Sequence, residues 1–169
     1  MNDQDKSTEK NEYIIVKESS IHNKGVFAKI LIPKGTRILQ YVGEKVTHEE
    51  GEKRSEKSTT NSGLVYIFEL NETHSIDGDV SYNAAKYVNH SCNPNCEVDI
   101  INDQIWYIAL RDILPEEELY LDYNYSFEPE FWKHPCRCGS KNCRGYIIDE
   151  DDMPKVKEAL ESGAYFTKF

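Results

Sequence analysis

The sequence predicts a mainly β fold of small sheets, with short helices and a helix near the C-terminus. Short runs rich in β-branched and aromatic residues recur along the chain, and turn-forming residues separate most of them. Long helical stretches do not alternate with these runs, as they would in a parallel α/β sheet. At 169 residues, the chain suits one domain with modest appendages.

The expected strands are residues 13–17, 30–32, 37–43, 64–70, 75–77, 98–101, 105–110 and 119–125. Residues 71–74 and the pair Asn102-Asp103 are expected hairpin turns. Thr47-His48-Glu49-Glu50 has capping-box spacing and opens a polar helix through about Lys57, followed by a loop over residues 58–63.

Acidic residues and Pro154 predict the start of a C-terminal helix near Asp151, with Val156, Ala159 and Leu160 on its apolar side. Residues 1–11 lack the apolar segment of a secretory signal and are expected to form a disordered tail. No apolar run reaches the length of a membrane span, so no membrane association is expected.

Acidic residues outnumber basic residues by 30 to 20, which gives a net charge of -10. Such a surface repels nucleic-acid phosphates, so no direct nucleic-acid binding is expected. It attracts basic proteins, although an acidic surface can equally serve solubility alone. Five cysteines without a secretory signal argue against a disulfide framework and favour a reducing compartment.

A dense polar segment, Asn89-His90-Ser91-Cys92-Asn93-Pro94-Asn95-Cys96, follows the apolar run 84–88. The run is either a short helix or a buried strand. Asn-Pro favours a turn, so a packed element leads into a turn whose side chains can converge on one place. The alternative is a hydrogen-bonded polar turn with a structural histidine.

Three cysteines near the C-terminus have the spacing of soft-metal ligands: Cys136, Cys138 and Cys143. Structural zinc takes four ligands in a closed site. Cys92 or Cys96 can supply the fourth ligand, and His134 is a rival. The alternative is three unligated thiols in a reducing compartment.

Five motifs together resemble those of SET-domain protein-lysine N-methyltransferases with a post-SET zinc segment. They are HNKGVF at 22–27, YVGE at 41–44, AAKYVNHSCNPNC at 84–96, EELYLDYNY at 117–125 and CRCGSKNCRG at 136–145. They resemble, in turn, that family's cofactor loop, Tyr-x-Gly-Glu motif, Asn-His-Ser-Cys signature, Asp-Tyr strand and post-SET motif. The motifs occur in the family's order, and the resemblance extends from Tyr13 to about Ile147.

The resemblance implies a SET-domain fold of small β-sheets with a pseudoknot, in which the Asn89-His90 segment and the Asp122-Tyr123 strand thread past each other. It divides the chain into a disordered tail (1–11), a SET domain (12–126), a post-SET zinc segment (127–148) and a C-terminal helix and tail (149–169).

The resemblance also implies S-adenosyl-L-methionine as methyl donor and Zn2+ as a structural metal. The residues that match the family's cofactor site are Asn23, Lys24, Gly25, Tyr66, Asn89 and His90. Tyr41 and Tyr123 match its two active-site tyrosines. The residues that match its zinc ligands are Cys92, Cys136, Cys138 and Cys143, which leaves Cys96 as the odd thiol.

The chain departs from the family pattern at several positions. Asn23 replaces a glycine of the cofactor loop, and Asn tolerates positive φ better than other non-glycine residues. Lys86-Tyr87 replaces Arg-Phe. Leu121 stands where the family has Phe or Tyr and sets product specificity, and the space it leaves predicts multiple methylation. No Cys-rich pre-SET region occurs and the insert between Tyr41 and Tyr66 is short, so the target stays open.

These features predict methyl transfer from S-adenosylmethionine to lysine side chains of a basic protein, with a histone tail as the first expectation. The substrate is expected to add as a strand along an exposed sheet edge. The alternatives are methylation of a non-histone basic protein and a catalytically inactive SET-fold binding module. We expect an intracellular monomer, cytoplasmic or on chromatin in a eukaryotic nucleus; the alternative is a secreted effector of a host-associated microbe.

Overall fold

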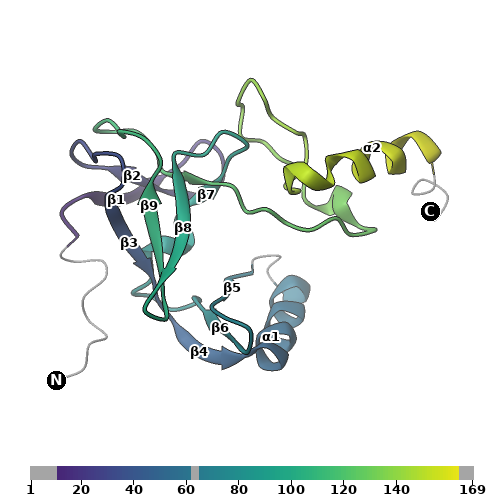
Figure 1. Cartoon of the computed structure of the whole chain (residues 1–169), viewed down its shortest axis with the longest axis horizontal. Coiled ribbons are helices and arrows are strands. Elements are labelled where there is room, and N and C mark those ends of the chain that lie inside the picture. Colours follow the sequence, from purple (N-terminus) through teal and green to yellow (C-terminus); the bar gives the residue numbers. More distant parts are fainter. Residues whose placement is uncertain (1–10, 62–64, 164–169) are drawn as a thin grey trace.

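The computed structural model describes residues 11–61 and 65–163, which fold into small sheets (Figure 1). β1 (Ile14–Glu18) and β2 (Lys24–Ala28) form an antiparallel pair. A three-stranded antiparallel sheet has the order β3 (Arg37–Tyr41), β9 (Gln104–Ala109) and β8 (Cys96–Ile101). A second has the order β4 (Glu44–Thr47), β6 (His74–Asp77) and β5 (Ile67–Glu69). The predicted β-rich fold is confirmed.

Two α-helices and several short 3₁₀ turns complete the described chain. α1 (His48–Asn61) lies beside the sheet of β4, β6 and β5, whereas α2 (Met153–Ser162) lies at the far end of the molecule (Figure 1). The 3₁₀ turns are η2 (Ala84–Tyr87), η3 (Phe131–Lys133) and η4 (Glu150–Asp152). None of the described helices combines the length and hydropathy needed to cross a membrane.

A short parallel pair ties together two segments that are distant in sequence. β7 (Asn89–His90) pairs with β10 (Tyr120–Leu121), and the Ser91 N–H donates to Leu121 O at 2.9 Å. Asn95 is fully buried; its Nδ2 donates to Glu118 O at 2.8 Å, and its Oδ1 accepts from the Tyr120 N–H at 2.7 Å. The crossing expected from the family resemblance is therefore held by main-chain and side-chain bonds.

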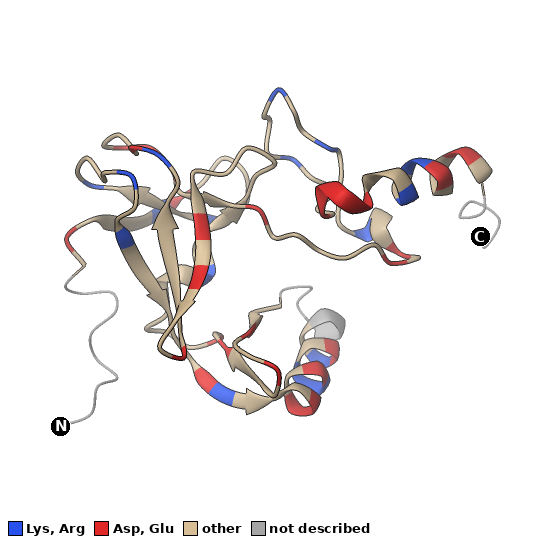
Figure 2. Cartoon of the chain, viewed as in Figure 1, with Lys and Arg blue, Asp and Glu red and all other residues tan. Residues whose placement is uncertain are grey.

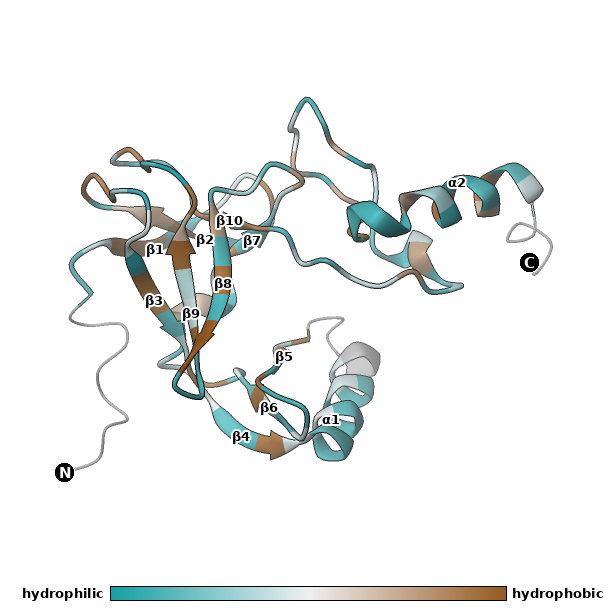
Figure 3. Cartoon of the chain, in the orientation of Figure 1, coloured by the Kyte–Doolittle hydropathy of each residue, from teal (hydrophilic) through white to brown (hydrophobic). Residues whose placement is uncertain are grey.

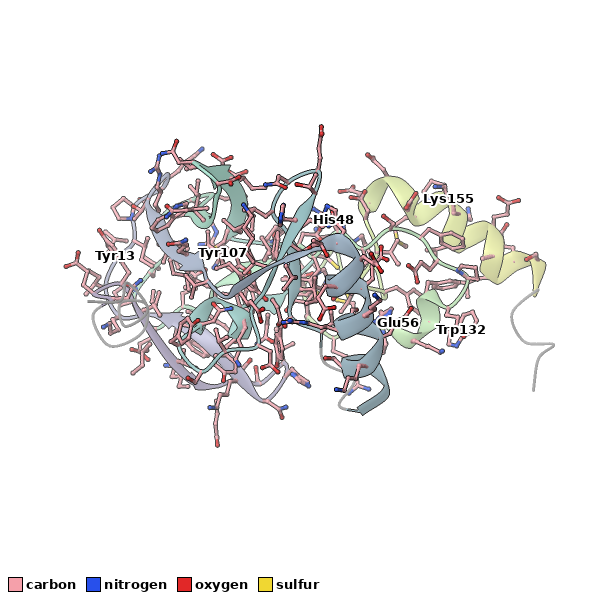
Figure 4. The ribbon with its side chains drawn as sticks, turned by 90° about the horizontal axis from the view of Figure 1, so that it is seen from below. Tyr13, His48, Glu56, Tyr107, Trp132 and Lys155 are labelled. Carbon is pink, nitrogen blue, oxygen red and sulfur yellow. The ribbon has the colours of Figure 1, made fainter. Side chains whose placement is uncertain are left out.

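The main core lies between the sheets, where apolar residues concentrate along β3 and β9 (Figure 3). Val26, Ile32 and Ile113 are fully buried in it. A second cluster of buried residues, Phe131, Ile148, Val156 and Ala159, joins η3 to α2. Trp132 and Lys155 lie with this second cluster, well apart from Tyr13, which precedes β1, and from Tyr107 in β9 (Figure 4). The C-terminal segment thus has a small core of its own.

Several predicted elements have different bounds in the structure. Residues 30–32 form no strand; Ile32 makes an isolated bridge to Ile113. The strand expected at 119–125 shrinks to β10, because the Tyr123 N–H bonds a histidine side chain instead of a neighbouring strand. α1 extends beyond Lys57 to Asn61, into the predicted loop. The predicted strand 64–70 is confined to β5, and its residue 64 lies outside the described residues.

Other differences arise from local sequence. β2 and β4 were not predicted, because in each strand polar or glycine residues come first and only two β-branched or aromatic residues follow, a run too short to indicate a strand. The run 84–88, left open as helix or strand, contains the 3₁₀ turn η2. Leu160 was assigned to the apolar side of α2, but it is 42% exposed. Residues 1–10 of the expected N-terminal tail (1–11) and residues 164–169 at the C-terminus lie outside the described residues, whereas Asn11 is described and its Nδ2 donates to Ile38 O at 2.8 Å.

Candidate active site

The expected cofactor loop approaches a buried carboxylate. Asn23 has a φ of 37°, the left-handed conformation that Asn tolerates. Gly25 follows it at the start of β2, and a Cβ atom there would stand 2.2 Å from Oε1 of Glu118. Only glycine allows the backbone this close to Glu118.

Asn89 holds the loop against that carboxylate. Its Nδ2 donates to Lys24 O at 3.0 Å and to Glu118 Oε1 at 2.8 Å. Glu118 is 6% exposed and also accepts from Ser19 Oγ at 3.0 Å and the Tyr120 hydroxyl at 3.1 Å. Sequence reasoning missed Glu118, although it lies within the EELYLDYNY motif, because nothing in sequence marks a glutamate as buried.

Two ammonium groups gather near the ring of Tyr87. Nζ of Lys24 lies 5.1 Å from the ring centroid and Nζ of Lys86 lies 5.4 Å from it. Lys86 also lies 5.2 Å from the ring of Tyr66 and pairs with Asp79 at 3.1 Å. Its side chain is only 9% exposed. Lys86 and Tyr87 therefore form a positively charged, aromatic corner beside Tyr66 and Lys24. This arrangement was not predicted from the sequence.

Tyr41 is buried and fixed at its hydroxyl. The hydroxyl donates to Tyr66 O at 2.7 Å, and the ring packs on Phe68 and Tyr107 with centroids 5.3 and 6.4 Å away. Gly78 is required beside it, because a Cβ there would stand 2.3 Å from the hydroxyl oxygen. Burial, and then the charge of Asp77, raises the pKa of Tyr41.

Tyr123 packs against the segment of β7, where β7 and β10 pair. Its hydroxyl donates to Val88 O at 2.8 Å, and its ring lies 5.3 Å from His90 and 5.7 Å from Tyr125. Burial raises the pKa of Tyr123 well above that of a free phenol. Tyr123 also contributes to the raised pKa of Tyr41, so the two phenols lie within electrostatic reach of each other. Both are therefore neutral hydrogen-bonding groups at physiological pH.

His90 is a neutral structural ring. Its Nδ1 accepts from the Tyr123 N–H at 3.2 Å, and its Nε2 lies 3.5 Å from Cys92 Sγ. Burial lowers the pKa of His90 to about 4, although the nearby carboxylate of Asp122 acts the other way. Leu121 is its register partner in β10 and is 6% exposed. Leu121 is therefore a buried part of the pairing between β7 and β10.

The structure brings four cysteine sulfur atoms together. Those of Cys92, Cys136, Cys138 and Cys143 all lie within 4.8 Å of one another. Cys92 and Cys136 are 3.7 Å apart, close to the roughly 3.8 Å that sulfur atoms span around a tetrahedral Zn²⁺ with bonds of about 2.3 Å. These four thiols fit a closed structural zinc site.

The two rival ligands lie elsewhere. Cys96 is 1% exposed and its thiol donates to Asn95 Oδ1 at 3.5 Å. The ring of His134 packs edge-on against Tyr125, with centroids 5.4 Å apart. Cys92 is therefore the thiol of the polar segment that joins the three C-terminal cysteines, and it links the knot to residues 136–143.

Comparison with known proteins agrees with this geometry. The sequence profile described as SET domain matches residues 23–124. The chain is 36% identical over 138 residues to histone-lysine N-methyltransferase trr of Drosophila melanogaster, which covers 79% of this chain and 6% of that protein. It is 40% identical over 139 residues to a histone-lysine N-methyltransferase, H3 lysine-4 specific, of Aspergillus oryzae, covering 76% of this chain and 11% of that protein.

Human histone-lysine N-methyltransferase 2D is 33% identical over 144 residues, covering 83% of this chain and 3% of that protein. The chain therefore spans only a small part of the length of these relatives. The matched residues 23–124 include Asn23, Gly25, Tyr41, Tyr123 and the paired strands β7 and β10. The chain belongs to the SET-domain family.

Proposed function

We propose that the chain is a protein-lysine N-methyltransferase that transfers methyl groups from S-adenosyl-L-methionine to a histone. The observation that carries the proposal is the convergence of Asn89, Tyr41 and Tyr123 around one buried crossing, close to the loop at Gly25. The names of the relatives support histone-lysine methylation as the activity.

The methyl donor carries a carboxylate, an amine, a sulfonium and an adenosine, and the corner described above offers matching groups. Asn23, Lys24 and Gly25 supply loop backbone, and Lys24 and Lys86 supply positive charge for the carboxylate. Tyr66 offers an aromatic face, while Asn89 and the backbone of His90 flank the loop. In this account Asn89 holds the loop in its binding conformation through Lys24 O.

The two tyrosines align the reaction. A free lysine has a pKa of about 10.4 and must lose its proton before it can attack the methyl group. An aromatic, desolvated channel lowers that pKa, and proton loss goes to solvent water. The hydroxyls of Tyr41 and Tyr123 orient the amine, and alignment of amine and methyl supplies much of the rate. Leu121 leaves room for added methyl groups, so multiple methylation belongs to the proposal.

Zinc would be held by Cys92, Cys136, Cys138 and Cys143, and it would supply structural closure of the C-terminal segment rather than chemistry. Acidic residues in η4, just before α2, and along β8 favour a basic substrate (Figure 2). β5, an edge strand of its sheet, is the proposed docking edge for a substrate strand. A nuclear location fits relatives that are named histone-lysine N-methyltransferases, and a monomer is part of the proposal without support from those names.

Radiolabelled methyl transfer to core histones and to ribosomal proteins, together with calorimetry of cofactor binding, tests the proposal. Label on a histone lysine, lost in the Tyr123→Phe variant, supports it. Label confined to ribosomal proteins would favour a non-histone substrate instead. Cofactor binding without transfer to any protein would identify an inactive binding module and overturn the proposed activity.

A further inference from the structure

Arg144 lies between the cysteine cluster and the segment after β10 that carries Asp122 and Tyr123. It directly follows Cys143, and its Nη2 donates to both carboxylate oxygens of Asp122, at 2.7 and 2.6 Å. The two side chains are only 11% and 17% exposed. A charge-assisted contact of this kind, largely removed from water, is strong and geometrically restrictive.

The backbone side of Arg144 contacts the cluster itself. Its N–H donates to Cys92 Sγ at 3.4 Å, and the neighbouring Asn142 Nδ2 donates to Cys92 O at 2.9 Å. Nε of Arg144 is buried and lacks a partner among the described residues, so one donor is left for which a thiolate is the matching acceptor.

Asp122, at the other end of the pair, controls the backbone at Tyr123. Its Oδ1 accepts from the Asn124 N–H at 3.2 Å and lies 3.6 Å from His90 Nδ1. Tyr123 lies between Asp122 and Asn124 in the sequence, and its N–H donates to the same Nδ1 of His90. A shift of Asp122 would therefore move the peptide that carries the Tyr123 phenol.

We propose that Arg144 is a positioning residue that couples closure of the cysteine cluster to the placement of the Tyr123 hydroxyl. This inference rests on the proposed function. The rigid guanidinium joins the two parts through Nη2, which contacts both oxygens of Asp122, and removing it leaves this carboxylate poorly solvated and without its main partner. Because Tyr123 aligns the amine, its displacement lowers turnover more than it lowers affinity for the methyl donor.

The test compares Arg144→Gln and Arg144→Lys with Lys141→Gln, a charge change on an exposed residue of the same loop. For each purified chain, zinc content, cofactor affinity, kcat and KM on a histone peptide, and hydrogen exchange over residues 119–125 are measured. Arg144→Gln is expected to keep its zinc and its cofactor affinity within about threefold. Its kcat falls roughly 100-fold, the scale of a 1 Å misplacement, and exchange at 119–125 rises.

Arg144→Lys is expected not to restore kcat, because an ammonium can contact the Asp122 oxygens but has no counterpart of the buried Nε and of the rigid guanidinium plane. If Arg144→Gln fails to fold, Asp122→Asn breaks the pair from the other end and should give the same pattern. A kcat matching that of Lys141→Gln overturns the inference, as does zinc loss in proportion to lost turnover. If the wild type transfers no methyl, the proposed function fails, while hydrogen exchange without substrate still decides the coupling.

Discussion

Asn89 bonds directly to the loop for which we propose cofactor binding. We expect Asn89→Ala to weaken S-adenosylmethionine binding by roughly 10-fold, because it removes bonds to Lys24 O and Glu118 and leaves a buried carboxylate short of a donor, a loss of about 1–3 kcal/mol. Asn93→Ala, in the same segment but exposed, is the matched control. Calorimetry measures both, and equal affinities for the two variants would contradict this role.

The raised pKa of Tyr123 makes a prediction about pH. A phenol whose pKa lies above its usual value stays protonated as pH rises from 7 to 9, so it cannot act as a base in that range. The rise of kcat/KM with pH should instead follow deprotonation of the substrate lysine. Tyr123→Phe is expected to lower kcat/KM by roughly 10-fold or more, while kcat/KM still rises with pH over the same range. A pH-independent residual rate in this variant would assign the ionisation to Tyr123.

Leu121 gives a prediction about product. We expect the wild type to add more than one methyl group, and Leu121→Tyr to stop at one, because the phenol fills space and can hold a water beside the amine. Leu121→Met conserves volume and should keep the wild-type products. Mass spectrometry of a long reaction distinguishes them, and a strict monomethyl product from the wild type would refute the expectation.

The types and spacing of residues predicted part of the candidate site, above all the cysteine cluster. Spacing alone left three candidates for the fourth ligand of the Cys-x-Cys-x4-Cys segment, and the family resemblance pointed to Cys92. The structure places the sulfur of Cys92, and not that of Cys96, with the other three. Glu118, Lys86 and Arg144 could not be assigned, because their roles depend on burial and on partners distant in sequence.

At the scale of elements, the crossing of β7 and β10 is the feature that joins the cofactor loop, the tyrosines and the cysteines. These strands have two residues each, too few for periodicity to reveal. Their pairing is fixed by Asn95, whose side chain bonds the chain at Glu118 and Tyr120. The longer hairpin of β8 and β9 followed from its sequence, because Asn102-Asp103 adopts the positive φ that its turn requires.

Cys92 couples the crossing to the C-terminal segment. Cys92→Ser is expected to lower zinc content and cofactor affinity together, because the segment that carries three of the four thiols would lose its attachment. Cys96→Ser, which changes a thiol outside the cluster, should retain zinc. Unchanged zinc content and unchanged cofactor binding in Cys92→Ser would show that this assignment is wrong.

The described residues form two hydrophobic cores, and the cysteine cluster lies in the same C-terminal part of the chain as the smaller one. A chelator is expected to release the C-terminal segment while the sheets stay folded, because none of the four cysteines of the cluster belongs to the larger core. Trp132 lies against the small core and Trp106 lies in β9. In a Trp106→Phe variant, chelation should therefore shift Trp132 emission with little change in the far-ultraviolet circular dichroism of the sheets. Loss of both signals together would show a single cooperative unit.

The central claim is that this chain positions a lysine amine and a methyl donor around Tyr123. The most direct measurement is a mass-spectrometric time course of a histone-tail peptide with S-adenosylmethionine and zinc-loaded enzyme, for the wild type and for Tyr123→Phe. The account predicts stepwise gain of methyl groups on one lysine with the wild type and a much slower gain with the variant. An unmodified peptide with a wild type that binds the cofactor, or equal rates for both chains, would contradict it.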